Sequence, residues 1–272
     1  MKQQKGPLVA TSIEALNRYP VKGLSGQVLT TVNLEPGEGF PSDRRFGFAR
    51  PNSGFDPEHP KPLPKSKFYV LARDAKLALL NTEFDESNGV LTMSSASASG
   101  QFSIVTTDGK LDASQFVKSF LELPSDETPT LYEASPHKFT DVSVDSVEMM
   151  NAVSIINLES VKDFSRTTGL EIDPARFRAN IHLSGLPAFS EFDMLGRFIT
   201  IGTARLKIVQ RTRRCPATEV DLNTGERNIK LPKLLYEKYG HRDMGVYAEV
   251  VRGGEIKVGD VAEFNAQLSD LK

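Results

Sequence analysis

The chain has 272 residues, of which 39% are hydrophobic and 25% are charged, and its formal net charge is -2. This is the composition of an ordinary globular protein with one large or two ordinary domains. The balanced charge argues against a general nucleic-acid binder, since such a protein carries a strong basic excess.

The N-terminal residues Met-Lys-Gln-Gln-Lys-Gly-Pro are polar and lack the apolar core of a secretory signal. No run in the sequence approaches the roughly 20 apolar residues that are needed to span a bilayer. We therefore expect a soluble, cytoplasmic protein without a membrane span.

Short strands separated by loops are predicted for the first half of the sequence. The predicted strands, including a meander at the end, cover residues 8–16, 28–34, 40–49, 89–95 and 101–106. Residues 68–80 fit a strand followed by a helix, and residues 112–121 have apolar positions at helical spacing. Five prolines between residues 51 and 64 predict a surface loop, which is either a lid beside a site or an excursion without a role.

A polar stretch at residues 126–130 marks the predicted boundary between two domains, 8–125 and 126–266. Helices are predicted from residue 157 to Gly169 and from 232 to Gly240, each ended by its glycine. Further strands are predicted at residues 176–184, 198–210, 246–252, 255–260 and 262–264, with a hairpin turn at Gly253-Gly254. Many short strands with few helices predict a mostly-β (α+β) fold, a β-barrel with helical decoration that follows a β-rich N-terminal domain.

The only cysteine, Cys215, lies in the segment Arg-Thr-Arg-Arg-Cys-Pro-Ala-Thr-Glu-Val-Asp at residues 211–221. A single cysteine excludes an internal disulfide, a CxxC zinc site and a four-cysteine iron–sulfur cluster. Nearby cations favour the thiolate, which is a nucleophile and a soft metal ligand, and they also suit a phosphate. A structural cysteine beside a solvated basic strand is the alternative.

Three other segments place cations in or beside predicted strands, and they are Tyr19–Lys22, Ser42–Arg45 and Arg176–Asn180. In a strand, Arg176, Arg178 and Asn180 would share one face and could line an anion site. A solvated strand face is the alternative for each segment. The four histidines are widely separated and lack metal-ligand spacing, and the sequence has neither a GxGxxG nor a Walker-type phosphate loop.

In this order along the chain, the segments resemble the MOSC family, named for the C-terminal domain of molybdenum cofactor sulfurases. The resemblance is greatest to members with an N-terminal β-barrel domain, such as the amidoxime-reducing components and their bacterial relatives. The matching residues are Tyr19-Pro-Val-Lys22, Asp43-Arg44, Arg178-Ala-Asn180, Arg214-Cys-Pro-Ala-Thr-Glu-Val-Asp221, Thr224-Gly225 and Ile256-Lys-Val-Gly-Asp260.

The resemblance implies a molybdenum cofactor, molybdopterin with molybdenum, and no dependence on pyridoxal phosphate. It makes Cys215 the protein ligand of molybdenum and a catalytic residue, with Asp221 as a second catalytic residue that shapes the site together with Thr218. The residues that it implies for cofactor binding are Lys22, Gly23, Arg44, Arg178, Asn180, Arg214 and Thr218, with Lys22 and Arg44 on the pterin phosphate.

The chain departs from the pattern of its nearest likeness at several positions. Gly23 stands where the amidoxime reducers usually have serine, so Ser25 is a candidate to supply the hydroxyl, and Arg45 replaces an aromatic residue. The chain also ends without the ferredoxin-like domain of some relatives. Electrons are therefore expected from a separate flavin, ferredoxin or cytochrome-type protein.

The first functional hypothesis is reduction of small N-hydroxylated or other N–O substrates at a molybdenum cofactor. The second is a cofactor or sulfur carrier that uses Cys215 as a persulfide site. The third is a non-catalytic anion-binding domain in which the cysteine is structural.

Overall fold

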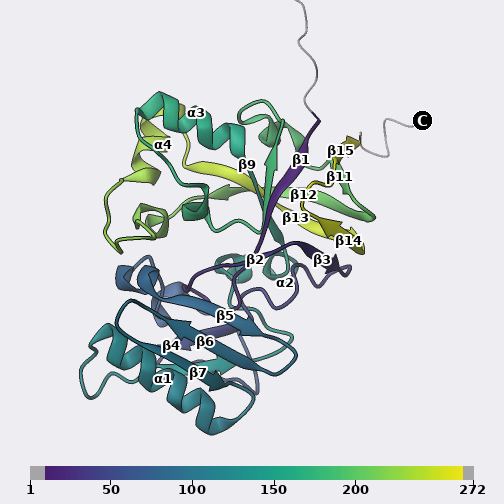
Figure 1. Cartoon of the computed structure of the whole chain (residues 1–272). Helices are drawn as coiled ribbons and strands as arrows, with labels where there is room; N and C mark the ends of the chain where they lie inside the picture. The colour runs from purple at the N-terminus through teal and green to yellow at the C-terminus, as the bar shows by residue number, and fades with distance from the viewer. Residues whose placement is uncertain (1–9, 266–272) are drawn as a thin grey trace, which may run out of the picture.

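The computed structural model describes residues 10–265, and its largest element is an eight-stranded sheet in the upper half of Figure 1. The strands follow the order β15-β11-β12-β13-β9-β10-β1-β2, and only β9 and β10 are parallel. Their bounds are β1 Ser12–Arg18, β2 Gln27–Leu29, β9 Val153–Asn157, β10 Ile181–Ser184, β11 Phe198–Ile201, β12 Ala204–Arg213, β13 Asp243–Arg252 and β15 Ala262–Asn265.

This sheet is curled, so that β1 approaches the β15 end of the strand order. Backbone hydrogen bonds join Ile13 to Asp260 and Ala262 to Thr11, and Ser12 forms a bridge with Val261. The enclosed core contains apolar side chains from both ends of the chain, for example Leu16, Ile181 and Ile199. The mostly-β prediction is therefore confirmed. The predicted start of the first strand at residue 8 lies outside the described residues.

The lower half of Figure 1 holds the antiparallel meander β5 Asn81–Asp85, β6 Val90–Ser94 and β7 Ser99–Ser103, of which β6 and β7 were predicted and β5 was not. Helix α1, Thr107–Leu121, packs beside it and begins where the Thr106 side chain accepts a hydrogen bond from Gly109 N. Strands β4 Phe46–Ala49 and β8 Thr130–Glu133 pair with each other. The meander, α1 and this pair share a second core, which includes Phe46, Leu91 and Val117.

The predicted helices of the second half are α3 Leu158–Thr168 and α4 Leu231–Tyr239, and both end at left-handed glycines, Gly169 and Gly240. A short helix, α2, spans Val147–Met150. Single 3-10 turns cover Lys65–Lys67, Ala75–Leu79, Asp141–Val144, Pro174–Phe177, Ser190–Met194 and Pro216–Glu219. Among residues 10–265, no helix is both long enough and apolar enough to cross a membrane.

The prediction of a strand followed by a helix over residues 68–80 is wrong, because this stretch holds only an isolated bridge at Phe68 and the 3-10 turn Ala75–Leu79. Two further local predictions are wrong. The Gly253-Gly254 segment does not join a hairpin, because β14, Gly254–Lys257, pairs with β3, Thr31–Leu34, and not with β13. The glycines allow the close approach to β3, since a Cβ on Gly253 would lie 2.7 Å from the Leu34 carbonyl oxygen.

The third wrong prediction is the strand over residues 176–184, of which only β10 is a strand. Pro174 starts a 3-10 turn whose first N–H groups are capped by the Asp173 side chain, and Arg178 then adopts a left-handed conformation with φ of 53°. Arg176 and Arg178 therefore do not lie on one strand face, although both reach the same cavity.

Candidate functional site

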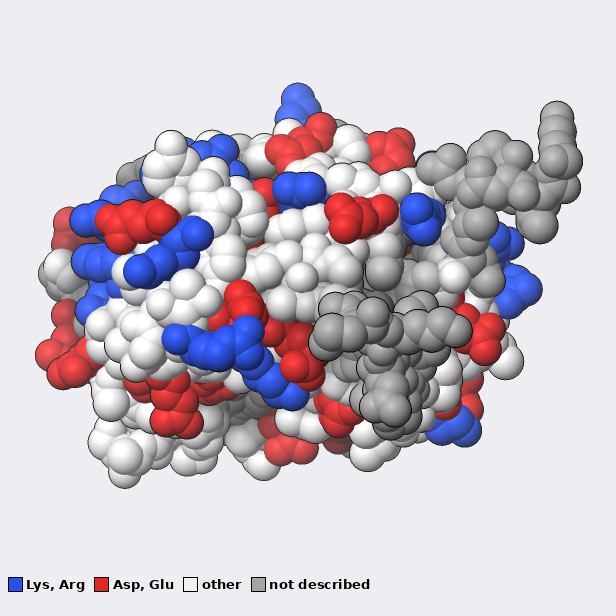
Figure 2. All heavy atoms as spheres, turned by 90° about the horizontal axis from the view of Figure 1, so that it is seen from above, with Lys and Arg blue, Asp and Glu red and all other residues white. Residues whose placement is uncertain are grey.

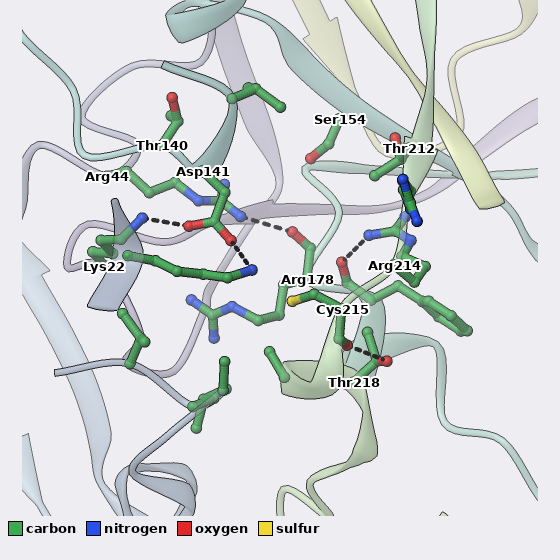
Figure 3. Close-up of a pocket in the computed structure, with 18 of the residues that line it drawn as sticks. Lys22, Arg44, Thr140, Asp141, Ser154, Arg178, Thr212, Arg214, Cys215 and Thr218 are labelled. Atoms are coloured by element: carbon green, nitrogen blue, oxygen red, sulfur yellow. Dashed lines mark hydrogen bonds and ion pairs between the residues drawn. The ribbon is translucent and has the colours of Figure 1, made fainter. Parts of the chain in front are cut away.

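A cavity of about 450 Å³ lies between the two halves of the molecule and contains the side chain of Cys215 (Figure 3). Seven Lys and Arg residues and three Asp residues line it. The cations are Lys22, Arg44, Lys65, Arg176, Arg178, Arg213 and Arg214. On the face shown in Figure 2, Lys and Arg are interspersed with Asp and Glu, whereas Lys and Arg outnumber Asp in the lining of the cavity.

The Cys215 turn is held by hydrogen bonds to its carbonyl oxygens. Cys215 precedes the 3-10 turn Pro216–Glu219, and the Thr218 hydroxyl and N–H donate to its carbonyl oxygen at 2.9 and 3.1 Å. Arg227 donates to Pro216 O at 2.8 Å and to Leu71 O at 2.8 Å, so it also ties this turn to the N-terminal half. These contacts fix the position of the sulfur before any ligand binds.

Arg214 and Asn180 serve mainly to fix the walls of the cavity. The buried Arg214 donates to the carbonyl oxygens of Met244 and Phe177, and burial lowers its pKa to about 10. Asn180 accepts hydrogen bonds from the backbone and hydroxyl of Ser154 and donates to Asn17 O, which joins β9 to β1. Both residues line the cavity, but most of their hydrogen-bonding groups contact protein.

Lys22, Asp141 and Lys65 form a chain of charges across the cavity. The Lys22 ammonium is 2.5 Å from Asp141 Oδ1 and 2.8 Å from Phe139 O, while Lys65 Nζ is 3.7 Å from Asp141 Oδ2. Burial would raise the pKa of Asp141, but the ammonium groups of Lys22 and Lys65 lower it well below its usual range. Burial would lower the pKa of Lys65, but the negative charges of Asp141 and Cys215 outweigh it and raise this pKa.

Arg44 and Arg178 stack on the ring of Tyr19, with guanidinium carbons 4.6 and 4.4 Å from the ring centroid. Arg44 also donates to Arg178 O at 3.0 Å and pairs with Asp43. Burial and the charge of Arg44 lower the pKa of Arg178 to about 10, so both groups stay charged at neutral pH. Two adjacent guanidinium groups in a partly enclosed cavity favour a bound anion.

Asp221 lies outside the lining of the cavity. Its Oδ2 accepts hydrogen bonds from Arg176 and Asn228, each at 2.8 Å, and its Oδ1 caps Asn223 and Thr224. This geometry gives Asp221 a positioning role, because it orients Arg176, which also donates to Glu219 O in the Cys215 turn. The catalytic role that the resemblance implies for Asp221 stays a prediction.

Gly23 lines the cavity in a conformation that favours glycine. Its φ is 83°, and a Cβ would lie 2.9 Å from Tyr69 O and from Val70 Cα. Ser25, the candidate to replace the missing hydroxyl, lies outside the cavity lining and contacts Thr82, whose N–H donates to the Ser25 hydroxyl oxygen at 2.7 Å. The cavity hydroxyls are those of Thr140, Ser154, Thr212, Thr218 and Tyr247.

The site brings together every predicted residue except Asp221, and it adds residues that the sequence did not indicate. Lys65 and Asp141 fall in segments without a strand or helix pattern, so no periodicity marked them. A cation at the end of the proline-rich segment was the only available signal for Lys65. Thr212 and Tyr247 come from the long strands β12 and β13, where only the fold shows which face borders the cavity.

The donor set suits a phosphorylated cofactor with a soft metal. A thiolate is a soft ligand, and the cations around it suit a phosphate. The Thr212 hydroxyl lines the cavity, is buried and has no hydrogen-bond partner among residues 10–265, so it is available to a ligand. Among residues 10–265, no group of three or more His, Cys, Asp or Glu residues is arranged to hold a metal ion.

Comparisons with known proteins match both halves of the chain. The family model of the MOSC domain matches residues 136–263, and that of the MOSC N-terminal beta barrel domain matches residues 10–127. No curated protein matched the sequence.

Several solved structures are similar. YuaD from Bacillus subtilis is 15% identical, covers 95% of this chain and 98% of its own, and gives a TM-score of 0.44. YiiM from Geobacillus stearothermophilus is 22% identical over 42% of this chain and 54% of its own, with a TM-score of 0.34. YiiM from Escherichia coli is 20% identical over 43% and 55%, with a TM-score of 0.30. This chain thus spans about half the length of the YiiM structures.

Proposed function

The chain belongs to the MOSC family, with the family's N-terminal β-barrel domain before its MOSC domain, and from that premise we propose that it binds a molybdenum cofactor through Cys215. We further propose that it uses the cofactor to reduce small N-hydroxylated or other N–O compounds. A separate protein would supply the electrons.

One observation carries this proposal. The only cysteine of the chain lies on a turn fixed by hydrogen bonds and places its sulfur in a cavity lined by seven cations (Figure 3). A structural cysteine would need neither the fixed turn nor the surrounding charge. The arrangement therefore supports ligand binding at the sulfur over the structural alternative.

The roles of the chain's residues follow from their positions. Lys22, Arg44 and Arg178 would hold the phosphate, because each keeps donor capacity beyond its contacts with protein. When bound, the cofactor supplies two-electron oxygen-transfer chemistry.

Tyr247 lines the same cavity, and its hydroxyl is suited to contact a substrate oxygen. Burial raises its pKa, although the positive charge of Arg214 opposes this effect. The phenol therefore keeps its proton at neutral pH and can donate a hydrogen bond to that oxygen.

The persulfide alternative also has an observation in its favour. Lys65 lines the same cavity as Cys215, and an ammonium stabilises an anionic sulfur whether that sulfur binds a metal or carries a second sulfur. The two functions differ in whether metal and pterin are present in the purified protein and in whether N–O compounds are turned over.

The first test measures molybdenum and pterin per chain in protein from a host that makes the cofactor. We expect stoichiometric metal and pterin, with turnover of an amidoxime by an artificial electron donor. Cys215→Ser should lose the molybdenum–thiolate signal in X-ray absorption and lose turnover. A variant that keeps full activity would refute Cys215 as the ligand, and wild-type protein with persulfide but no metal would favour the sulfur carrier.

A second test addresses the phosphate contacts. Lys22→Gln and Arg44→Gln should each weaken pterin retention about tenfold or more, because a charge-assisted hydrogen bond is worth roughly 1.5–3 kcal/mol. Pterin content after extensive dialysis measures the effect, and circular dichroism checks the fold. The exposed Lys61 lies outside the cavity lining, so Lys61→Gln is the matched control. Unchanged retention in both cavity variants would rule out this phosphate site.

A further inference from the structure

The cations of the cavity differ in how far the protein itself satisfies them. Arg214 donates to two backbone carbonyl oxygens, and Arg176 pairs with Asp221 at 2.8 Å. Lys22 donates to a carbonyl oxygen and to a carboxylate. Arg44 and Arg178 donate to carbonyl oxygens and stack on Tyr19. All five groups are held in place by contacts with protein, and the donors that remain on Lys22, Arg44 and Arg178 are those that the proposed function assigns to the cofactor phosphate.

Lys65 and Arg213 are different. The Lys65 side chain is 39% exposed, and its carboxylate partner Asp141 is 3.7 Å away, which is too far for a direct hydrogen bond. Arg213 is exposed, and its guanidinium group makes no hydrogen bond or ion pair within residues 10–265. Both side chains line the cavity that contains Cys215, so their donors are available to a ligand there.

The charges of the cavity can be compared with those of the proposed cofactor. Seven cations face three aspartates, an excess of four, and Asp221 neutralises Arg176 from outside the lining, which leaves three. A cofactor phosphate carries up to about two negative charges. The Cys215 thiolate takes up the remaining positive charge, so a preference for an anionic substrate rests on the donors of Lys65 and Arg213 that no protein group satisfies and not on a net excess of charge.

We propose that Lys65 and Arg213 make this site selective for N–O substrates that carry a carboxylate. The proposal rests on the proposed function, because it specifies which N–O compounds the site prefers. The planar guanidinium of Arg213 matches the two oxygens of a carboxylate, and the Lys65 ammonium adds a second donor group in the same cavity. A neutral substrate would leave Lys65 and Arg213 solvated and would gain no binding free energy from either group.

The test compares benzamidoxime with 4-carboxybenzamidoxime on the holoprotein with an artificial electron donor. The wild type should prefer the acid about tenfold or more in kcat/KM, since tenfold corresponds to about 1.4 kcal/mol and one charge-assisted contact reaches that value. Lys65→Gln and Arg213→Gln should each lower this acid-to-neutral ratio toward one, and Lys65→Arg should retain most of it. Lys61→Gln, on the same proline-rich segment, should leave the ratio unchanged.

A wild-type ratio near one, or the same ratio in Lys65→Gln and Arg213→Gln as in the wild type, overturns the inference. If neither compound is reduced, the proposed function fails, and the inference is decided by calorimetric binding of the two compounds to the purified protein. Tighter binding of the acid that is lost in Lys65→Gln then upholds it, and equal affinities overturn it.

Discussion

At the scale of single residues, Gly23 shows how the backbone sets the identity of a side chain at the site. Relatives usually have serine there, but in this chain a side chain would point into the backbone of residues 69 and 70. The missing hydroxyl is therefore a consequence of how the loop before the Ala75–Leu79 turn packs against the Lys22 segment.

We predict that Gly23→Ser destabilises the protein beyond the ordinary cost of a left-handed residue. The control is Gly37→Ser, because Gly37 has a φ of 75° and no atom within 4 Å of its added Cβ. The control should lose about 1–2 kcal/mol of unfolding free energy, and Gly23→Ser should lose about 1–3 kcal/mol more from the clash. Urea denaturation measures both. Equal losses would mean that residues 69 and 70 move aside.

The residues that sequence reasoning identified share one property, since each belongs to a short segment with a recognisable pattern. Cys215, Lys22 and Arg44 were found in this way. Lys65 and Asp141 were missed because their positions depend on the packing of irregular segments. The sequence showed no local signal for the contact that Asp141 makes with Lys22, 119 residues earlier in the chain.

At the scale of elements, regular structure was predicted well where a cap or a periodicity defined it. Helix α3, Leu158–Thr168, is capped by Asn157 at its start and by Gly169 at its end, as expected. The proline-rich segment was correctly predicted to lack strand and helix, but it is anchored to the protein. Phe55 is only 7% exposed and packs against Phe139, Tyr132 and His137. The spacing of the prolines did not indicate that the Phe55 side chain would anchor the proline-rich segment to the protein, or that Lys65 would then lie in the cavity.

Glu191 connects the Ser190–Met194 turn to the start of α3 and predicts a pH effect on stability. Its buried carboxylate accepts hydrogen bonds from Asn157 and Ser160, at 2.9 Å each. Burial raises its pKa above the usual 4.5, although these hydrogen bonds lower it in part. The folded protein therefore holds this proton more tightly than the unfolded chain. The stability from this group is complete below about pH 4.5 and is lost as the pH rises through the raised pKa.

We expect Glu191→Gln to remove this pH-dependent component, so that unfolding free energy falls less between pH 4.5 and 7 than in the wild type. Urea denaturation at a series of pH values measures it. Glu122→Gln is the control, because Lys76 lowers the pKa of the exposed Glu122 and its small contribution has the opposite sign. Parallel pH profiles for the wild type and Glu191→Gln would show that Glu191 has the same pKa folded and unfolded.

At the scale of the whole molecule, the two halves depend on each other. Lys22, Arg44 and Lys65 come from the N-terminal half of the chain and meet Arg178 and Cys215 in one cavity. The strands β1 and β2 also come from the N-terminal half but belong to the large sheet (Figure 1). The predicted domain boundary at residues 125 and 126 remains a prediction, and a fragment that starts there would lack two strands of its sheet.

We predict that residues 126–272 alone do not fold cooperatively. In the full chain, β1 pairs with β10, where Ile181 and Leu183 are only 0% and 1% exposed. Without β1, these two side chains would be exposed to solvent. Thermal melting followed by near-ultraviolet circular dichroism should show no sharp transition. The control is the full chain cut between residues 125 and 126 after folding, which should stay assembled in size-exclusion chromatography. A sharp melt of the fragment would show that β10 does not need its neighbour.

The pairing of β1 with β10 also bears on synthesis by the ribosome. Leu16 pairs with Ile181, so β1 leaves the ribosome long before its neighbour exists. At about 5–20 residues per second, the delay is about ten to thirty seconds. The meander and α1 contain only nearby segments and can fold during that time. Until the large sheet closes, Ile13 and Leu16 stay uncovered on the nascent chain, in the state that chaperones bind.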